Sequence, residues 1–521
     1  MAFINIQTNN LTRELRNSTT FIDNWAYVPG TAITGDWKQP YAFTSLEDFK
    51  SQFGTKSPEN SITFEYVSGL LNSGIPVLFR RIACINQDTG SEELGVQKAS
   101  VILTHDVAEP EQKTVSDVKI TEKFGGTFGN TMSITVRNTG IAYWIEVYSD
   151  YTLLERQKLI AVSATDDDQE VINTKLIESL KSTQFERIDV EVLEEDPKVF
   201  RLEPVSGKQL SGGADFDEDL VPNEIAKSYD YIYDKILYQP KFITSGGYTD
   251  TDISQTTSMA NAMKKITLTR QDCRALIDLP LGTPQEEYQT LAGQVGYQQL
   301  SNIQSIPSAS MCGPWQYMQV GNSQVWMPPS YVYLTVVGNA LSAGQAVYIP
   351  KAGISNGQVS NIIRSEFEIG SDLSEKWQSD TAVNINPIMR LQGGRYVIAG
   401  NSTLLIPDAY EGENNAFSES SSDLAVIEIR RFVYNLATEL QYQYNSLTAF
   451  ENFALQTSNF LDTMKNDGAV TDYVIANESS DEEPRKLKIR LDVSLTPTIK
   501  DIDIMINISY GSVEVITGGE A

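Results

Sequence analysis

Apolar and polar residues alternate along two stretches near the C-terminal end of the chain. The apolar positions of the first stretch are Leu487, Ile489, Leu491, Val493 and Leu495. Those of the second are Ile502, Ile504, Ile506 and Ile508. A period of two predicts β-strands with one apolar face and one solvated face. We expect the last strand either to complete a sheet of its own chain or to join the sheet of a neighbouring chain.

The N-terminal part reads as an arm followed by a compact α/β unit. Residues 1–30 form the arm, which carries a short strand from Phe3 through Ile4 to Ile6. Residues 31–91 begin with a helix that Ser45 caps and Gly54 ends. A second helix begins near Pro58, and residues 77–83 follow as a strand.

Residues 92–221 show short strands separated by polar loops. The candidates are 118–120, 132–136, 144–147, 188–193 and 199–202. Their regular spacing predicts a β-sandwich or barrel domain inserted into the chain.

Helical and strand patterns alternate over residues 222–400. The expected helices are 255–269 and 284–302, and residues 273–278 form a buried strand that ends at Pro280. This alternation predicts a mainly parallel sheet covered by helices. Residues 401–521 read as a strand (424–430), two helices (431–444 and 447–466), a hairpin and a terminal strand. The fold class is therefore a multidomain mixture of α+β and α/β parts.

Composition limits the classes of partner. The 521 residues carry a net charge of −28, which repels nucleic acid and anionic membranes, so we expect neither as a partner. No apolar run is long enough to span a bilayer, and residues 1–5 lack the features of a signal peptide. We therefore expect a protein made in a cytoplasm. Three widely spaced cysteines suggest no disulfide framework.

Candidate catalytic and metal-binding motifs fail on inspection. The one histidine, His105, cannot supply a His-ligated zinc site, and a Ser-His-Asp triad would have to use it. Asp215 to Asp219 have the spacing that begins a calcium loop, but Leu220 and Ala226 stand where glycine and glutamate are needed. We expect no catalytic residue, metal or cofactor.

Several short motifs, taken in order, resemble the tail sheath proteins of contractile bacteriophages and related injection machines. Near the N-terminal end they are residues 45–54, 69–74 and 77–81, followed by the glycine-rich segments 124–130 and 209–215. Further along they are residues 327–330, 350–353, 383–387, 400–404, 429–431 and 468–474. Phe216 departs from the family pattern, where glycine is usual.

The resemblance implies an architecture. Residues 31–91 and 401–521 would build an inner α/β domain from both chain ends, residues 92–221 would form the inserted β domain, and residues 222–400 a central domain similar in fold to subtilisin. His105 falls in the inserted region, so no triad forms in the central domain and the protein is not expected to be an enzyme.

The resemblance also implies a function. Such proteins polymerise as stacked hexameric rings around an inner tail tube, in a metastable extended state, and contract to drive the tube through a cell envelope for genome delivery. The implied partners are other copies of the chain, the tail tube, the baseplate and the tail terminator, in a virion assembled in the host cytoplasm. A bacterial injection device is the alternative, and a subtilisin-fold hydrolase is a remote one. A host- or carbohydrate-binding role for the inserted domain could coexist with the first two.

Two sets of residues are implied to make contacts between subunits. Exchanged strands would use Phe3, Ile4 and Ile6 at one end and Ile502, Ile504, Ile506 and Ile508 at the other. On the helix 447–466, a charged face with Glu451, Asp462 and Lys465 would contact the tube. The alternatives are strands that stay within one chain and a helix face that is merely solvated.

Overall fold

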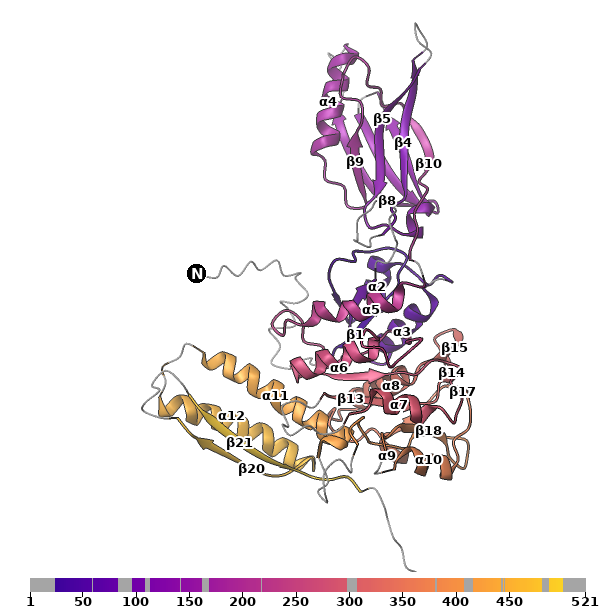
Figure 1. Ribbon diagram of the computed structural model, residues 1–521. Coiled ribbons are helices and arrows are strands. Elements are labelled where there is room, and N and C mark those ends of the chain that lie inside the picture. Colours follow the sequence, from indigo (N-terminus) through magenta and orange to yellow (C-terminus); the bar gives the residue numbers. More distant parts are fainter. Residues whose placement is uncertain are drawn as a thin grey trace, which may run out of the picture. The chain divides into compact units, whose positions relative to one another are not determined.

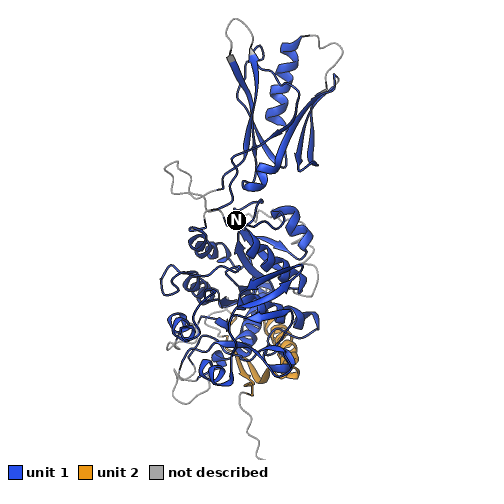
Figure 2. Cartoon of the chain, turned by 90° about the vertical axis from the view of Figure 1, so that its right-hand side faces the viewer, with its two compact units in different colours: residues 1–444 blue, residues 445–521 orange. Residues whose placement is uncertain are grey.

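The computed structural model describes residues 24–499, apart from 59, 83–95, 108–112, 141, 162–167, 217, 298–306, 380–381, 407–415, 442–443, 445 and 480–486. The chain divides into two compact units, residues 1–444 and residues 445–521 (Figure 2). The proposed exchange residues at both chain ends lie outside the described residues.

Among the described residues, a nine-stranded sheet forms the centre of the first unit (Figure 1). In order across the sheet, its strands are β16 (Gln358–Val359), β19 (Tyr396–Ile398), β18 (Asn386–Arg390), β13 (Ala309–Gly313), β12 (Arg274–Ile277), β11 (Phe242–Ile243), β1 (Ala26–Gly30), β3 (Val77–Arg81) and β2 (Tyr41–Phe43). The strands from β18 to β3 are parallel, whereas β19 and β2 are antiparallel to their inner neighbours. The mainly parallel sheet agrees with the prediction for residues 222–400, but it also takes in strands from residues 26–81.

Helices pack on both faces of this sheet. Successive residues of a strand point to opposite faces, so neighbouring residues contact different helices. Ile243 of β11 belongs to a core shared with α5, α6 and α7. Its neighbour Phe242 packs edge-on against Tyr333 of α8, with ring centroids 6.5 Å apart. Outside the insertion, the described helices of the unit are α2 (Leu46–Phe53), α3 (Ser61–Asn72), α5 (Val221–Ser228), α6 (Met259–Arg270), α7 (Tyr288–Val295), α8 (Pro329–Ser342), α9 (Gly353–Asn356), α10 (Ser371–Trp377) and α11 (Ser420–Leu440). The unit also contains a small sheet with the strand order β15 (Ser323–Met327), β14 (Gln316–Val320) and β17 (Ile362–Ser365).

The insertion has a hydrophobic core of its own, running from Ala99 to Leu210. One of its sheets contains β4 (Ser100–Val107), β5 (Lys113–Glu122) and β9 (Ile188–Val192). The other contains β10 (Val205–Gln209), β6 (Met132–Asn138), β7 (Ala142–Ser149) and β8 (Thr152–Ala161). The helix α4 (Gln169–Ser182) packs into the same core through Leu176, Ile177 and Leu180. The sequence did not predict this helix.

The second unit consists of one helix and a hairpin. Helix α12 (Leu447–Asn466) has the predicted bounds, and β20 (Val470–Asn477) pairs antiparallel with β21 (Ile489–Leu495). Within the described ranges, no helix of the chain combines the length and apolar character that a membrane span needs.

The prediction of a strand at 424–430 is wrong, because these residues belong to α11. The start of that helix is buried nearly all round, from Ser420 to Ala425. It therefore lacks the one-sided apolar stripe that identifies a helix in sequence. Buried polar contacts hold it, since Arg274 pairs with Asp423 at 2.7 Å.

Other predictions were displaced. Residues 26–30 are not part of an arm but form the fully buried strand β1. Proline is rare inside a central strand, so Pro29 argues against a strand in the sequence. Residues 199–202 are not a strand. The amides of Val199 and Phe200 donate to the carbonyl of Asp196, and Asn173 donates to the carbonyl of Phe200 at 2.8 Å. Helix α7 begins at 288 rather than 284, because Pro284 begins a turn, and it ends at 295, before Gly296. The last part of the predicted range, 298–302, lies outside the described residues.

Candidate functional site

The second unit offers an amphipathic helix laid along a two-stranded ribbon. Five residues of α12 are buried in a single stripe, namely Ala449, Phe453, Thr457, Leu461 and Met464. Their spacing of four, four, four and three is that of one helix face. In β21, the apolar positions Ile489 to Leu495 are half-buried and the residues between them exposed, as the alternation predicted.

The ribbon has open edges within the described part of the chain. The sheet consists of β20 and β21 alone there, so each strand has one edge that pairs with no other described strand. A lone two-stranded sheet is marginally stable, and its edges are templates for another strand. After Thr496, whose amide donates to the carbonyl of Ala469 at 3.1 Å, the chain leaves the ribbon, and Ile499 is 83% exposed.

The three charged residues predicted to face a tube are exposed on α12. Two of them lie beside β20. Asp462 accepts a hydrogen bond from the hydroxyl of Tyr473 at 2.7 Å, and Lys465 lies 3.4 Å from the carboxylate of Asp472. Glu451 is nearer the other end of the helix. The carboxylate of Asp462 raises the pKa of Tyr473. All three positions are accessible to a partner.

A buried arginine joins the inserted domain to the central sheet. Arg81, at the end of β3, is fully buried and donates to the carbonyls of Gly35 at 2.8 Å, Phe124 at 2.9 Å and Gly125 at 3.0 Å. Its guanidinium also lies 3.8 Å from the carboxylate of Asp215. The segments 77–81, 124–130 and 209–215, noted separately in the sequence, thus meet at one point.

Asp215 and Asn130 make further hydrogen bonds at this junction. Asp215 accepts from the amide of Thr127 at 2.7 Å and from its hydroxyl at 2.5 Å. The amide group of Asn130 both donates to and accepts from the backbone of Gly213, at 2.8 Å each way. A Cβ on Gly213 would lie 2.2 Å from the carbonyl oxygen of Gly126, so the close approach needs glycine. The sequence motifs marked the three segments of this junction separately and gave no sign that they meet.

A buried polar network in the central domain contains an aspartate and a serine, as a Ser-His-Asp triad does, but its third member is a tyrosine and not a histidine. Asp278, after β12, accepts hydrogen bonds from both the amide (2.8 Å) and the hydroxyl of Ser330, at the start of α8. The hydroxyl of Tyr66 lies 2.8 Å from that of Ser330. All three side chains are buried. Burial raises the pKa of Asp278 to about 7, against the opposing effect of its Ser330 hydrogen bonds.

The histidine lies in the inserted domain, away from this network in the fold. Its Nδ1 is 2.7 Å from the carboxylate of Asp117, on the neighbouring strand β5, and both side chains are buried. This is the structural bonding expected of a core histidine. Among the described residues, no group of three or more His, Cys, Asp or Glu side chains could hold a metal ion.

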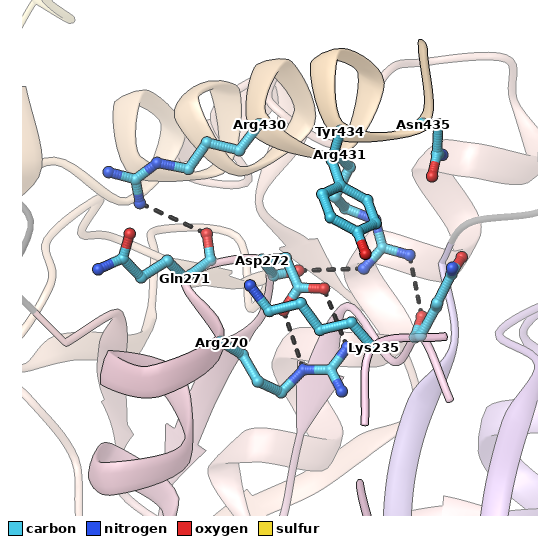
Figure 3. Close-up of a pocket in the computed structure, with 9 residues that line it drawn as sticks. Lys235, Arg270, Gln271, Asp272, Arg430, Arg431, Tyr434 and Asn435 are labelled. Carbon is cyan, nitrogen blue, oxygen red and sulfur yellow. Dashed lines mark hydrogen bonds and ion pairs between the residues drawn. The ribbon is translucent and has the colours of Figure 1, made fainter. Parts of the chain in front are cut away.

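A cationic pocket of about 210 Å³ lies between the end of α6 and the middle of α11 (Figure 3). Its lining includes four cationic residues, Lys235, Arg270, Arg430 and Arg431, and one carboxylate, Asp272. The sequence did not reveal this pocket, because its residues come from three separate segments.

The fold is similar to those of two solved sheath tail proteins. The one from Listeria innocua superposes with a TM-score of 0.61 at 12% identity, covering 94% of this chain and 95% of that chain. The one from Desulfitobacterium hafniense has a TM-score of 0.56 at 10% identity, covering 91% and 97%. At such identities the likeness is one of fold. No family model matches the sequence, and no curated protein matches it.

Proposed function

Because the chain has the fold of sheath tail proteins, we propose that it is the subunit of a contractile tail sheath. The resemblance drawn from the sequence motifs is confirmed at the level of the fold. The observation that carries the proposal is its extent, since both solved proteins are matched over more than nine-tenths of their length. This extent supports our assignment of the inserted domain and the terminal unit to the same sheath subunit.

In this function the subunits form hexameric rings stacked around a tail tube. The sheath assembles in an extended, metastable state and shortens by re-packing subunit contacts, which drives the tube through a cell envelope. No nucleotide is required, because two packings of one sequence can differ by a few kcal/mol. Many subunits that switch together then supply the work. Baseplate and tail terminator proteins would bind the two ends of the sleeve.

The terminal hairpin is the proposed acceptor of exchanged strands. Its edges on β20 and β21 suit added strands that supply main-chain hydrogen bonds. Each such bond contributes about 1 kcal/mol net. We assign Phe3, Ile4 and Ile6 of one subunit and Ile502, Ile504, Ile506 and Ile508 of another to this role. The segment after Thr496 would act as the tether that bends while subunits rotate.

We further propose that the exposed face of α12, with Glu451, Asp462 and Lys465, contacts the tube. The buried stripe of α12 leaves these charges outside the core. The same fold serves a phage virion, where contraction leads to genome delivery, and a bacterial injection device. The motifs resemble those of both kinds of device, so we propose the phage tail sheath first and keep the bacterial injection device as the alternative.

Electron microscopy of the purified protein tests the function. A sheath subunit should polymerise at high concentration into hollow, striated sleeves. A chain that stays monomeric over that range, with or without tube protein, would argue strongly against the proposal.

A truncation tests the strand exchange. Deletion of residues 502–521 should leave a folded subunit, by circular dichroism and thermal melting, that forms no sleeves. Two double variants test the two faces of the proposed strand separately. Ile504→Asp with Ile506→Asp should block assembly, whereas Asp503→Asn with Asn507→Asp, which conserves net charge, should not. Normal sleeves from the truncated chain would refute the exchange.

A further inference from the structure

The cationic pocket is an exception on a strongly acidic chain. Four cationic side chains and one carboxylate line it, whereas the chain as a whole has a net charge of −28. Lys235 comes from the loop after α5, Arg270 from the end of α6, and Arg430 and Arg431 from α11. Figure 3 shows these side chains gathered around one opening, with Tyr434 beside them.

Two of the four cations are used to build the pocket. Arg270 is buried and makes a paired interaction with Asp272, with both nitrogen–oxygen distances at 2.9 Å. Arg431 is also buried and donates to the carbonyls of Asp272 at 3.0 Å and Gln239 at 2.9 Å. These two arginines fix the walls.

The other two cations are available to a ligand. Lys235 is partly exposed and makes no ion pair with any described residue. Within the described residues, the one hydrogen bond of Arg430 is long, 3.4 Å, to the carbonyl of Gln271. Burial lowers the pKa of Arg430, although Asp423 opposes the shift. A partly desolvated guanidinium with weak hydrogen bonding gains from a carboxylate.

Exposed apolar side chains flank the pocket. Ile236 is 70% exposed and Leu237 is 68% exposed, and both follow Lys235 directly. Their backbone amides point to the carboxylate of Asp234, at 2.7 and 3.4 Å, so the turn that presents them is fixed. Tyr434, on the wall, is 46% exposed. Arginine and tyrosine beside exposed aliphatic groups are typical of interface centres.

We propose that this surface, Lys235, Ile236, Leu237, Arg430 and Tyr434, binds an acidic segment of a second copy of the chain. The inference rests on the proposed function and adds to it a contact separate from the exchanged strands. Charge complementarity favours this occupant, because any neighbouring copy presents a large excess of carboxylates. A carboxylate from that copy enters between Lys235 and Arg430, while apolar groups next to it cover Ile236 and Leu237.

Charge reversal tests the contact. Lys235→Glu with Arg430→Glu should raise the critical concentration for sleeve formation about tenfold or more, because it places like charges together in an interface. The control is Lys198→Glu with Arg395→Glu, which changes charge equally at two exposed sites and should polymerise as wild type does. Lys235→Arg with Arg430→Lys should retain assembly.

The outcomes separate this inference from the function it rests on. If wild type and the reversed variant polymerise alike, the contact is refuted and the sheath function stands. If wild type stays monomeric, both fall. A loss of monomer thermal stability in the reversed variant, with assembly unchanged, would show that the chain's own residues fill the pocket and would overturn the proposal.

Cross-linking gives a second readout that does not depend on variants. A zero-length carbodiimide reagent, applied to sleeves made from mixed ¹⁴N and ¹⁵N copies, should join Lys235 to an Asp or Glu in mixed-isotope pairs. Cross-links of Lys235 only within one copy would refute the contact. Saturable binding of inorganic phosphate to the monomer, without a Lys235 cross-link between copies, would identify a small-anion site instead and overturn the assignment.

Discussion

The guanidinium of Arg81 lies 3.8 Å from the carboxylate of Asp215, and both side chains are buried at the root of the inserted domain. One residue ends a strand of the central sheet, and the other follows the last strand of the insertion. Because the chain crosses this point on its way into and out of the insertion, the pair and its carbonyl contacts fix the two connections together.

Loss of Arg81 should destabilise the junction strongly. Arg81→Met removes the donors for three carbonyls and leaves Asp215 without its buried counter-charge. We expect a loss of about 3–5 kcal/mol, as for one partner removed from a buried pair. The measurement is denaturant unfolding, together with limited proteolysis near residues 33–35 and 124–126.

The matched control is an exposed arginine. Arg137 pairs with Glu146 at 2.7 Å, but its side chain is 56% exposed. Arg137→Met should leave the free energy of unfolding nearly unchanged, because solvent screens the exposed pair. Equal losses in the two variants would contradict the role assigned to Arg81.

The two adjacent glycines of the junction should respond differently to alanine. A Cβ on Gly213 would meet the carbonyl oxygen of Gly126 at 2.2 Å, whereas one on Gly212 meets nothing within 4 Å. Gly212 has a φ of +89°, so Gly212→Ala should cost about 1–2 kcal/mol from backbone strain alone. Gly213→Ala should cost clearly more, because backbone must move. Thermal melting compares them, and a milder effect at Gly213 would contradict the close approach.

Stability should depend on pH through Asp278. Its folded pKa, about 7, is above its ordinary value of 3.8. The folded state therefore binds the proton more tightly, and this contribution is complete below about pH 4 and is lost as the pH rises through 7. The slope is at most about 1.4 kcal/mol per pH unit.

The variant Asp278→Asn isolates this effect, since the amide keeps an acceptor for the amide of Ser330. Relative to the variant, wild type should be most stable below about pH 4, should lose stability as the pH rises to about 7, and should be clearly less stable near pH 8 than near pH 5. Melting curves at several pH values measure the difference. A difference that does not change with pH would show that Asp278 does not titrate in this range.

Neutralising the exposed face of α12 should affect tube binding and not folding. Glu451→Gln, Asp462→Asn and Lys465→Gln together should change stability by less than about 1 kcal/mol, because the charges are exposed. Co-sedimentation of the sheath with tube protein should fall several-fold. The control set Asp372→Asn, Glu375→Gln and Lys376→Gln changes the same residue types at exposed positions of α10. Equal tube binding by the two triple variants would remove the assignment.

Much of the fold could be predicted where local signals and packing agree. The cap at Ser45, the end at Gly54, the bounds of α12 and the alternation in β21 all follow from patterns of a few residues. The secondary structure was predicted wrongly for elements that are buried on several sides. The start of α11 and the strand β1 carry no one-sided stripe, and their surroundings come from segments far away in the chain.

The candidate sites differ in the same way. The strands of the hairpin and the charged positions of α12 could be predicted from the sequence, because each pattern lies within a single strand or helix. The junction at Arg81 and the pocket at Lys235 were not, because each joins side chains more than a hundred residues apart, Arg81 with Asp215 and Lys235 with Arg430.

The sequence by itself determined that the chain is a mixed α and β protein with a single histidine, that its C-terminal part alternates as strands do, and that its motifs resemble those of tail sheath proteins. These properties depend on composition and on short-range periodicity. Only the tertiary structure decided that strands from residues 26–81 complete the central sheet, that Arg81 and Asp215 meet, and that an acidic chain holds a cationic pocket. Such properties depend on contacts between distant segments, and these exist only once the chain has packed.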